Sequence, residues 1–204
     1  VTSMEYSGLL IVVSGPSGTG KGTVIRALRE ISSSIKVLPS VTTRSPRKGE
    51  KESYNYFFRT RKEFKKMVEK DEFVEWVEYC DNYYGTPRKQ LENSLKSGTD
   101  TVLEKEVEGA IKIKEQYPDC VSIFLLPPSF EELKRRIKER GTEHISIIEK
   151  RLKKALEEIS YVNKYDYVVI NDCIENAVKA ISCIIQAEKL KTERNLDILK
   201  GIVL

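Results

Sequence analysis

The stretch that most constrains this chain is Gly15-Pro-Ser-Gly-Thr-Gly-Lys-Gly-Thr23, close to its N-terminus. It follows the apolar run Leu9–Val13 and opens a helical pattern over Thr23–Ile31. A strand, a glycine-rich loop and a helix in this order are typical of a loop that binds nucleotide phosphates. Glycines let consecutive backbone N–H groups turn inward, the helix N-terminus adds positive potential, and Lys21 reaches the terminal phosphates. The alternative is a plain glycine-rich turn, which the flanking strand and helix disfavour.

One position departs from the usual form of such a loop. Gly22 stands where a Ser or Thr normally follows the lysine, and Thr23 comes one residue later. The hydroxyl that would hold Mg²⁺ is therefore absent or shifted by one residue. We expect the metal to be held mostly through water.

The length of 204 residues suits one or two compact domains. A hydrophobic share of 40% and a charged share of 32% are typical of a globular chain rather than a disordered one. The net charge of +4 favours anionic ligands but is too mixed to indicate nucleic acid. Four scattered cysteines without a Cys-x-x-Cys pair favour reduced thiols over a disulfide frame or a zinc site. With no long apolar stretch and no signal-peptide pattern, we expect a cytoplasmic protein without a membrane partner.

Strands and helices alternate along most of the chain. Strands are predicted at Leu9–Val13, Lys36–Val41, Tyr54–Phe58, Phe73–Tyr79, Asp100–Glu104, Val121–Leu126 and Tyr167–Ile170. Helices are predicted at Thr23–Ile31, Lys62–Lys70, Val107–Gln116 and Ser129–Ile137, and from Pro87 and near Ile174 onward. Asp81–Thr86 has the composition of a turn, and Arg140–Thr142 that of a hinge between two helices. This alternation predicts an α/β fold with a parallel, doubly wound sheet, whose ligands bind at the carboxyl ends of the strands.

Several motifs, in one order and at one set of spacings, resemble those of guanylate kinases. They are the phosphate loop, Ser40–Glu50, Tyr56–Phe58, Phe73–Trp76, Asn82–Thr86, Arg140–Thr142, Lys150–Leu152 and Val169–Asp172. The resemblance runs from about residue 8 to about residue 190. It implies a P-loop core with a small GMP-binding lobe and a mobile helical lid. It also implies transfer of a phosphoryl group from ATP, as co-substrate, to GMP, with Mg²⁺ as cofactor, in purine nucleotide metabolism.

The resemblance divides the chain and assigns its residues. It implies a single domain over residues 1–204, with a core of 4–39, 87–134 and 163–204, a GMP-binding lobe of 40–86 and a lid of 135–162. The implied catalytic residues are Lys21, Arg44, Arg140 and Arg151. The implied ATP-binding residues are Gly15, Pro16, Ser17, Gly18, Thr19, Gly20, Lys21, Gly22, Thr23, Arg136 and Asn171. The implied GMP-binding residues are Ser40, Arg44, Arg47, Tyr56, Glu75, Tyr84, Thr86 and Glu106. Thr23 and Glu104 are the candidates for the metal, directly or through water.

The residue chemistry supports several of these assignments without the family. Guanine presents two adjacent donors, N1–H and N2–H₂, and the carboxylate of Glu75 can accept both. Adenine lacks that pair, so a buried Glu75 would be left unpaired against AMP, at a cost of roughly 10⁴-fold or more. An outward position on an alternating strand is the alternative for Glu75, and apolar Phe73 and Val77 on its face argue against it.

Arginines suit the phosphates on both sides of the reaction. The planar, paired donors of Arg44 and Arg47 fit the oxygens of a GMP phosphate, although a solvated basic loop is the alternative. Phosphoryl transfer depends on placement and on neutralised charge, and a GMP phosphate is already ionised, so no general base is required. We therefore expect His144, the only histidine, to be an exposed lid residue. For Asn171, a place near adenine and a cap on the next helix remain open.

The clearest departure from the resemblance is Glu104-Lys-Glu106-Val-Glu108, where the family usually has Asp, Asp and Gln at the three acidic positions. Period two on a strand predicts that the three carboxylates share one face. From the roles of the two Asp residues in the family, the resemblance implies that Glu106 is the candidate for the guanine edge and Glu104 for the waters of Mg²⁺. Each added methylene moves a carboxylate by roughly 1.5 Å, and Glu108 adds a negative charge that Lys105 could offset.

Two rival functions stay open. One is a catalytically weak guanylate-kinase-like module that binds nucleotides or serves as a scaffold, which the intact loop with Lys21 disfavours. The other is a kinase for AMP, suggested by the ending Gly20-Lys-Gly-Thr23 and opposed by Glu75, Tyr84 and Thr86. The sequence leaves a monomer and a homodimer equally open.

Overall fold

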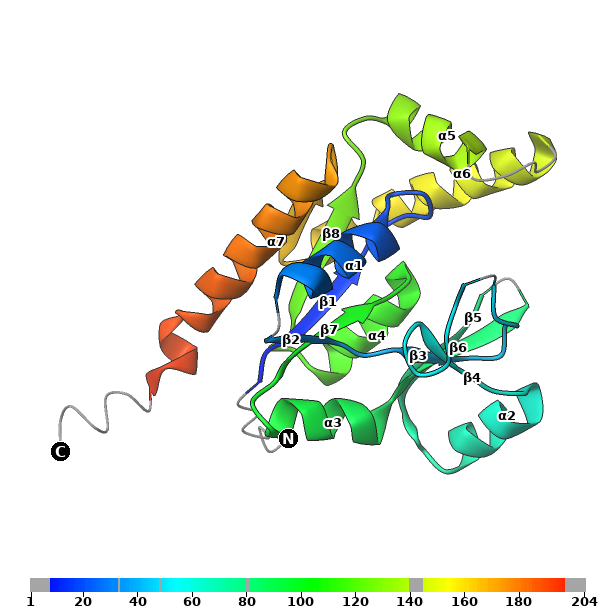
Figure 1. Ribbon diagram of the computed structural model, residues 1–204. Coiled ribbons are helices and arrows are strands. Elements are labelled where there is room, and N and C mark those ends of the chain that lie inside the picture. The colour runs from blue at the N-terminus through cyan, green and yellow to red at the C-terminus, as the bar shows by residue number, and fades with distance from the viewer. Residues whose placement is uncertain (1–7, 33, 48, 80, 140–144, 197–204) are drawn as a thin grey trace, which may run out of the picture.

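The computed structural model describes residues 8–32, 34–47, 49–79, 81–139 and 145–196 (Figure 1). At its centre lies a five-stranded sheet in which every neighbouring pair is parallel, in the order β2-β7-β1-β8-β9. Its strands are β1 (Leu10–Ser14), β2 (Ile35–Val37), β7 (Asp100–Glu104), β8 (Val121–Leu126) and β9 (Tyr167–Ile170). Its flanking helices are α1 (Lys21–Ile31), α3 (Arg88–Lys96), α4 (Val107–Gln116) and α7 (Ile174–Lys189). Short 3₁₀ helices span Val162–Lys164 and Thr192–Arg194.

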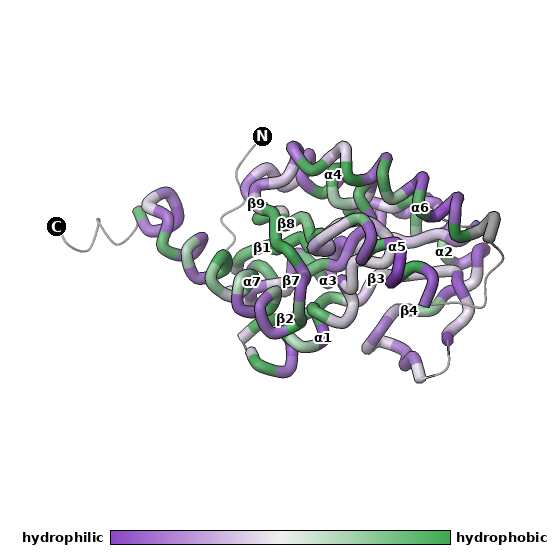
Figure 2. The backbone as a smooth tube through the Cα atoms, turned by 90° about the horizontal axis from the view of Figure 1, so that it is seen from above, coloured by the Kyte–Doolittle hydropathy of each residue, from purple (hydrophilic) through white to green (hydrophobic). Residues whose placement is uncertain are grey.

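The central strand β1 is buried on both faces, which explains its unbroken apolar sequence. Ile11 and Val13 pack in one cluster with residues of α1 and α7, whereas Leu10 and Val12 pack in another with residues of α3 and α4. Figure 2 shows hydrophobic residues gathered along β1 and β8 and hydrophilic residues along the outer helix that follows β8. Helices therefore cover both faces of a parallel sheet, and the doubly wound α/β fold predicted from the sequence is confirmed.

A second, four-stranded sheet has the order β4-β3-β6-β5 and carries one helix. It is formed by β3 (Ser40–Thr42), β4 (Tyr56–Phe58), β5 (Phe73–Tyr79) and β6 (Asn82–Pro87), with α2 (Arg61–Glu69) packed on it. We call these five elements the strand-rich lobe. Phe64 of α2 is 1% exposed and stacks on Phe73, so the lobe has a small aromatic core of its own.

Two predictions made from the sequence in this region are wrong. The predicted single strand Lys36–Val41 is two strands, because β2 joins the parallel sheet and β3 joins the lobe. Pro39 lies between them, and a residue without a backbone N–H interrupts a ladder. The predicted turn Asp81–Thr86 instead contains β6, which pairs antiparallel with both β3 and β5.

Two helices, α5 (Phe130–Glu139) and α6 (Ile145–Ile159), form the outer layer near the phosphate loop (Figure 1). Leu133 and Ile137 of α5 pack against Ala155 of α6 in a separate cluster. The predicted hinge Arg140–Thr142 lies outside the described residues. Within the described part of the chain, no helix is long and apolar enough to cross a membrane.

Candidate active site

The phosphate loop joins the carboxyl end of β1 to the start of α1. Gly20 precedes the helix with φ of 89°, a backbone conformation that favours glycine, and an added Cβ there would lie 2.6 Å from the Asn171 side chain. Lys21 is 7% exposed, and its ammonium donates to the carbonyls of Gly15 at 2.5 Å and Pro16 at 3.2 Å. The loop is therefore folded around its own lysine, at the strand ends where the fold predicts a ligand.

Two side chains from elsewhere in the chain brace this loop. The amide of Asn171, just beyond β9, donates to the carbonyl of Thr19 at 2.7 Å, and Arg136 of α5 donates to the carbonyl of Asn171 at 3.0 Å. Arg136 also reaches the Thr19 carbonyl at 3.4 Å. Asp172 accepts from the N–H of Cys173, the residue before α7, at 2.6 Å and from the side-chain amide of Asn176 in the first turn of α7 at 3.0 Å. The Asn171 side chain therefore contacts the phosphate loop and does not cap α7, whose N-cap residue is Cys173, while its place near adenine stays a prediction.

Helix α6 contacts the loop through two residues. Arg151 donates to the Ser17 hydroxyl at 3.1 Å, and the carboxylate of Glu158 accepts the backbone N–H of Ser17 at 3.3 Å. Burial raises the pKa of Glu158, and the nearby charge of Glu106 adds to that effect. Arg140, predicted to act beside Arg151, lies outside the described residues.

Glu104, Glu106 and Glu108 do not share one strand face, so that prediction is wrong. The strand ends at Glu104 and α4 begins at Val107, which places Glu106 at the helix start and Glu108 in its first turn. Glu108 forms an ion pair with Lys112 at 2.8 Å, one turn along the same helix. Glu106 lies 3.8 Å from the ammonium of Lys21, and its Oε2 atom is buried without a hydrogen bond from any described residue.

The donor set at the loop fits a magnesium ion that keeps most of its water. The Glu104 carboxylate lies 3.4 Å from the position a Cβ would take on Gly22, so a carboxylate faces the place of the missing hydroxyl. Among the described residues, no group of three or more His, Cys, Asp or Glu could hold a metal alone. Mg²⁺ in nucleotide sites typically needs only one or two protein oxygens beside phosphates and water. The hydroxyl of Thr23 is instead bonded by Arg26 at 3.3 Å, which leaves Glu104 as the better-placed candidate.

A buried polar group lies where the strand-rich lobe meets the loop after β7. Glu75 is 5% exposed, and its Oε1 atom accepts the hydroxyl of Thr86 at 2.6 Å. The ammonium of Lys105 lies 3.0 Å from the same oxygen and donates to the hydroxyl of Ser40 at 2.8 Å. A Cβ on Gly109 would lie 3.1 Å from the Oε2 atom of Glu75, so the glycine leaves room for the carboxylate. The structure therefore brings Ser40, Glu75 and Thr86 together and adds Lys105 to them.

A second polar group gathers on β4, β6 and the loop after β3. The guanidinium of Arg44 lies 5.3 Å from the ring centroid of Tyr56, which meets the ring of Tyr84 edge-on at 6.1 Å. Burial, with the charge of Glu104 nearby, raises the pKa of Tyr56 to about 12, so its hydroxyl is a neutral donor at any physiological pH. These three side chains can together bind an anionic phosphate.

A carboxylate of the same loop holds that arginine. Glu50 accepts from one terminal nitrogen of Arg44 at 2.8 Å and 3.0 Å, and from the backbone N–H of Arg47 at 2.8 Å. Burial alone would raise the pKa of Glu50, but hydrogen bonds from Arg44 and Arg47 outweigh it and lower that pKa. The Arg47 side chain is exposed, and its backbone N–H is the part of Arg47 that joins this group.

Three residues of the site were not predicted as part of it: Lys105, Glu50 and Glu158. Lys105 stands between Glu104 and Glu106, which were both predicted as site residues. A lysine between two acidic residues at the end of a strand was the sequence signal that could have placed it in the site. Glu50 ends the basic loop and Glu158 lies one turn beyond Ala155 in the charged lid segment, where nothing local separates them from surface charges.

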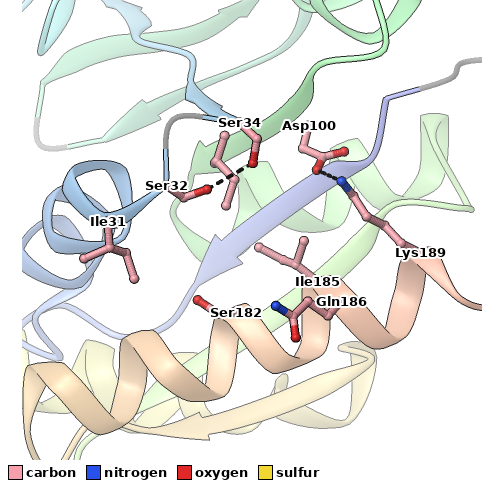
Figure 3. Close-up of a pocket in the computed structure, with 9 residues that line it drawn as sticks. Ile31, Ser32, Ser34, Asp100, Ser182, Ile185, Gln186 and Lys189 are labelled. Atoms are coloured by element: carbon pink, nitrogen blue, oxygen red, sulfur yellow. Dashed lines mark hydrogen bonds and ion pairs between the residues drawn. The ribbon is translucent and has the colours of Figure 1, made fainter.

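A hollow of about 490 Å³ lies at the amino-terminal edge of the parallel sheet (Figure 3). It is bordered by the amino ends of β2 and β7 and by α7, where Lys189 and Asp100 form an ion pair. Asp100 also accepts the backbone N–H of Leu9 at 3.1 Å. These contacts tie α7 to the sheet, and the hollow is separate from the site at the carboxyl ends.

The fold and the site together define a class. A parallel doubly wound sheet, a glycine-rich loop that encloses a lysine at the end of β1, and arginines from a helical layer beside it define a P-loop nucleotide-binding protein. Within that class the comparison with known families is specific, because the profile described as guanylate kinase matches residues 7–188. The chain belongs to the guanylate kinase family.

Relatives agree along nearly the whole chain. A guanylate kinase of Caldanaerobacter subterraneus is 53% identical over 196 residues, covering 96% of this chain and 95% of that protein. One of Halalkalibacterium halodurans is 52% identical, covering 95% of both chains. The crystal structure of a guanylate kinase from Anaplasma phagocytophilum superposes with a TM-score of 0.78 at 41% identity, covering 92% of this chain and 89% of that one.

Proposed function

We propose that this chain is an active guanylate kinase, which transfers the terminal phosphoryl group of ATP to GMP. The observation that carries the proposal is the buried carboxylate of Glu75, bonded by Thr86 at 2.6 Å and paired with Lys105 at 3.0 Å. Such a carboxylate can accept the N1–H and N2–H₂ donors of guanine, which adenine does not present as a pair. The family membership and the full-length relatives support the same activity.

The remaining groups suit the two phosphate chains. The phosphate loop with Lys21, and Arg151 and Arg136 beside it, would bind the ATP phosphates, while Arg44 and Tyr56 would bind the GMP phosphate. Glu106, which lies 3.8 Å from Lys21, directly follows Lys105 in the chain, so adjacent residues join the phosphate loop to the base pocket. Since the GMP phosphate is already ionised, these residues need only align the reactants and neutralise charge.

Mg²⁺ is proposed as the cofactor, with Glu104 holding it through water. When bound, the ion would neutralise charge on the transferring phosphates. The proposed partners are small nucleotides, ATP and GMP. The proposed compartment is the cytoplasm, where both nucleotides are available.

The test is a coupled assay of ADP formation with ATP, Mg²⁺ and each nucleoside monophosphate in turn. We expect turnover with GMP and little with AMP. No turnover with any of them, while GMP still binds, would favour the binding module. Turnover with AMP would show that the base pocket has been misassigned.

Two variants make the assay specific to residues. Glu75→Gln should lower kcat/KM for GMP by about a hundredfold, because an amide replaces a charged acceptor of two hydrogen bonds. Glu78→Gln, on the exposed face of the same strand, is the matched control and should behave as the wild type. Equal GMP kinetics for Glu75→Gln and the control would contradict the assignment of Glu75.

A further inference from the structure

Lys105 is a buried lysine whose partners both belong to the base pocket. Its side chain is 5% exposed, and its ammonium lies 3.0 Å from Glu75 and 2.8 Å from the Ser40 hydroxyl. Burying an ammonium is costly unless it is paired and hydrogen-bonded, and these two contacts supply that. They also place a positive charge between the two residues proposed to contact guanine.

The chemistry of the two groups fixes which of them donates and which accepts in the contact between Lys105 and Ser40. An ammonium has three donors and no acceptor, so the Ser40 oxygen must be the acceptor in their contact. The hydroxyl hydrogen of Ser40 then points to another acceptor, and the ammonium keeps a third hydrogen beyond its contacts with Glu75 and Ser40. The pocket therefore offers donors on the side of Lys105 and Ser40, and an acceptor carboxylate beside them.

This order of donors and acceptors matches one edge of guanine. Along that edge guanine presents an acceptor, O6, followed by two donors, N1–H and N2–H₂. Adenine presents a donor at position 6 and an acceptor at N1, so it opposes the pocket at both places. We propose that Lys105 determines specificity for the 6-oxo group of the purine, by orienting the Ser40 hydroxyl and by donating to O6. The inference deepens the proposed function and rests on it.

The test combines a change at O6 of the nucleotide with a substitution of Lys105 in the pocket. The ligands are GMP and 6-thio-GMP, which keeps the N1–H and N2–H₂ donors but has sulfur, a weaker acceptor, in place of O6. The variants are Lys105→Met and, as matched control, Lys114→Met, which removes a lysine paired with Asp166 at 2.7 Å outside the pocket. The readouts are kcat/KM and the binding affinity of each nucleotide.

We expect the wild type and Lys114→Met to prefer GMP over 6-thio-GMP by about tenfold, the size of a charge-assisted hydrogen bond. In Lys105→Met the preference should fall to within about twofold of unity, and use of AMP relative to GMP should rise. Lys105→Arg, which keeps the charge and donors, should restore part of the preference. If Lys105 were only structural, its replacement would change stability but not the ratio of kcat/KM for GMP to that for 6-thio-GMP.

Other outcomes would overturn the role of Lys105, the proposed function, or both. An unchanged preference in Lys105→Met would overturn the inference while leaving the GMP kinase activity standing. If Lys105→Met does not fold, Ser40→Ala takes its place, and an undiminished preference there would also overturn it. If the wild type binds GMP but does not phosphorylate it, the proposed function fails and the affinity ratios still decide the role of Lys105. Failure of the wild type to bind GMP would overturn both.

Discussion

Replacing Phe64 with alanine is expected to loosen the strand-rich lobe while leaving the parallel sheet folded. Phe64 is 1% exposed, and its ring centroid lies 4.5 Å from that of Phe73, 5.4 Å from Tyr83 and 6.3 Å from Trp76. Removing a phenylalanine from such a core typically costs about 3–5 kcal/mol in the free energy of unfolding. A domain is stable by about 5–15 kcal/mol in total, so the loss would be large. Phe64→Leu is the control, at under about 1.5 kcal/mol, because much of the volume is kept.

The chain supplies its own local probe for this change. Trp76 is the single tryptophan and contacts Phe64 edge-on, so its fluorescence reports on the lobe, whereas far-UV circular dichroism reports on the whole chain. In urea, the fluorescence transition of Phe64→Ala should precede the dichroism transition, and the two should coincide in Phe64→Leu. The KM for GMP should rise and the affinity for ATP should persist, because the phosphate loop packs on another cluster. Coincident transitions shifted by under about 1 kcal/mol, or equal loss of both nucleotides, would refute this reasoning.

Two further changes separate backbone and charge effects in the site. Gly20→Ala should strongly weaken ATP binding in a titration, because the added Cβ would lie 2.6 Å from the Asn171 side chain. The control is Gly49→Ala, which has a similar φ of 87° but open space around the added Cβ, and it should leave the affinity for ATP unchanged. Equal loss of affinity in both variants would show that the positive φ alone, and not the contact with Asn171, is responsible. Glu158→Gln should raise the melting temperature at pH 8, and the gain should vanish by about pH 4. Burial raises the pKa of Glu158, so its ionised form costs stability above the pKa of the unfolded chain and not below it; a gain that persists in acid would contradict this.

The parallel sheet was predictable because its signals are local. The apolar run of β1 requires burial on both faces, and the glycine-rich loop with Lys21 has one structural context. β6 was missed because Asn82 and Gly85 have turn composition, and only its place between β3 and β5 makes the segment a strand. Pro39, by contrast, was a local signal for the end of β2 that the prediction did not use.

For the acidic stretch Glu104–Glu108, the strand periodicity was correct but was extended beyond the end of the strand. Period two holds up to Glu104, where the strand ends, and the change to helix at Val107 turns Glu108 toward Lys112. The residue types of the base pocket were predictable from the chemistry of guanine. The pairing of Glu75 with Lys105 was not, because it joins elements 30 positions apart in the sequence.

The contacts within the site suggest what nucleotide binding must change. Arg44 is held by Glu50 at 2.8 Å, Lys21 lies 3.8 Å from Glu106, and Lys105 lies 3.0 Å from Glu75. Each cation is thus already near a carboxylate of the same chain, which lowers the cost of keeping charges together in a partly buried site. If Arg44 binds a phosphate as proposed, that phosphate would replace Glu50 as its anionic partner, so that one anion is exchanged for another. Glu75 differs, because in the proposed complex guanine would bring it hydrogen-bond donors and Lys105 could stay in place. The phosphate groups and the base would therefore be bound by different physics within one site: exchange of ionic partners for the first, completion of a preformed hydrogen-bond pattern for the second.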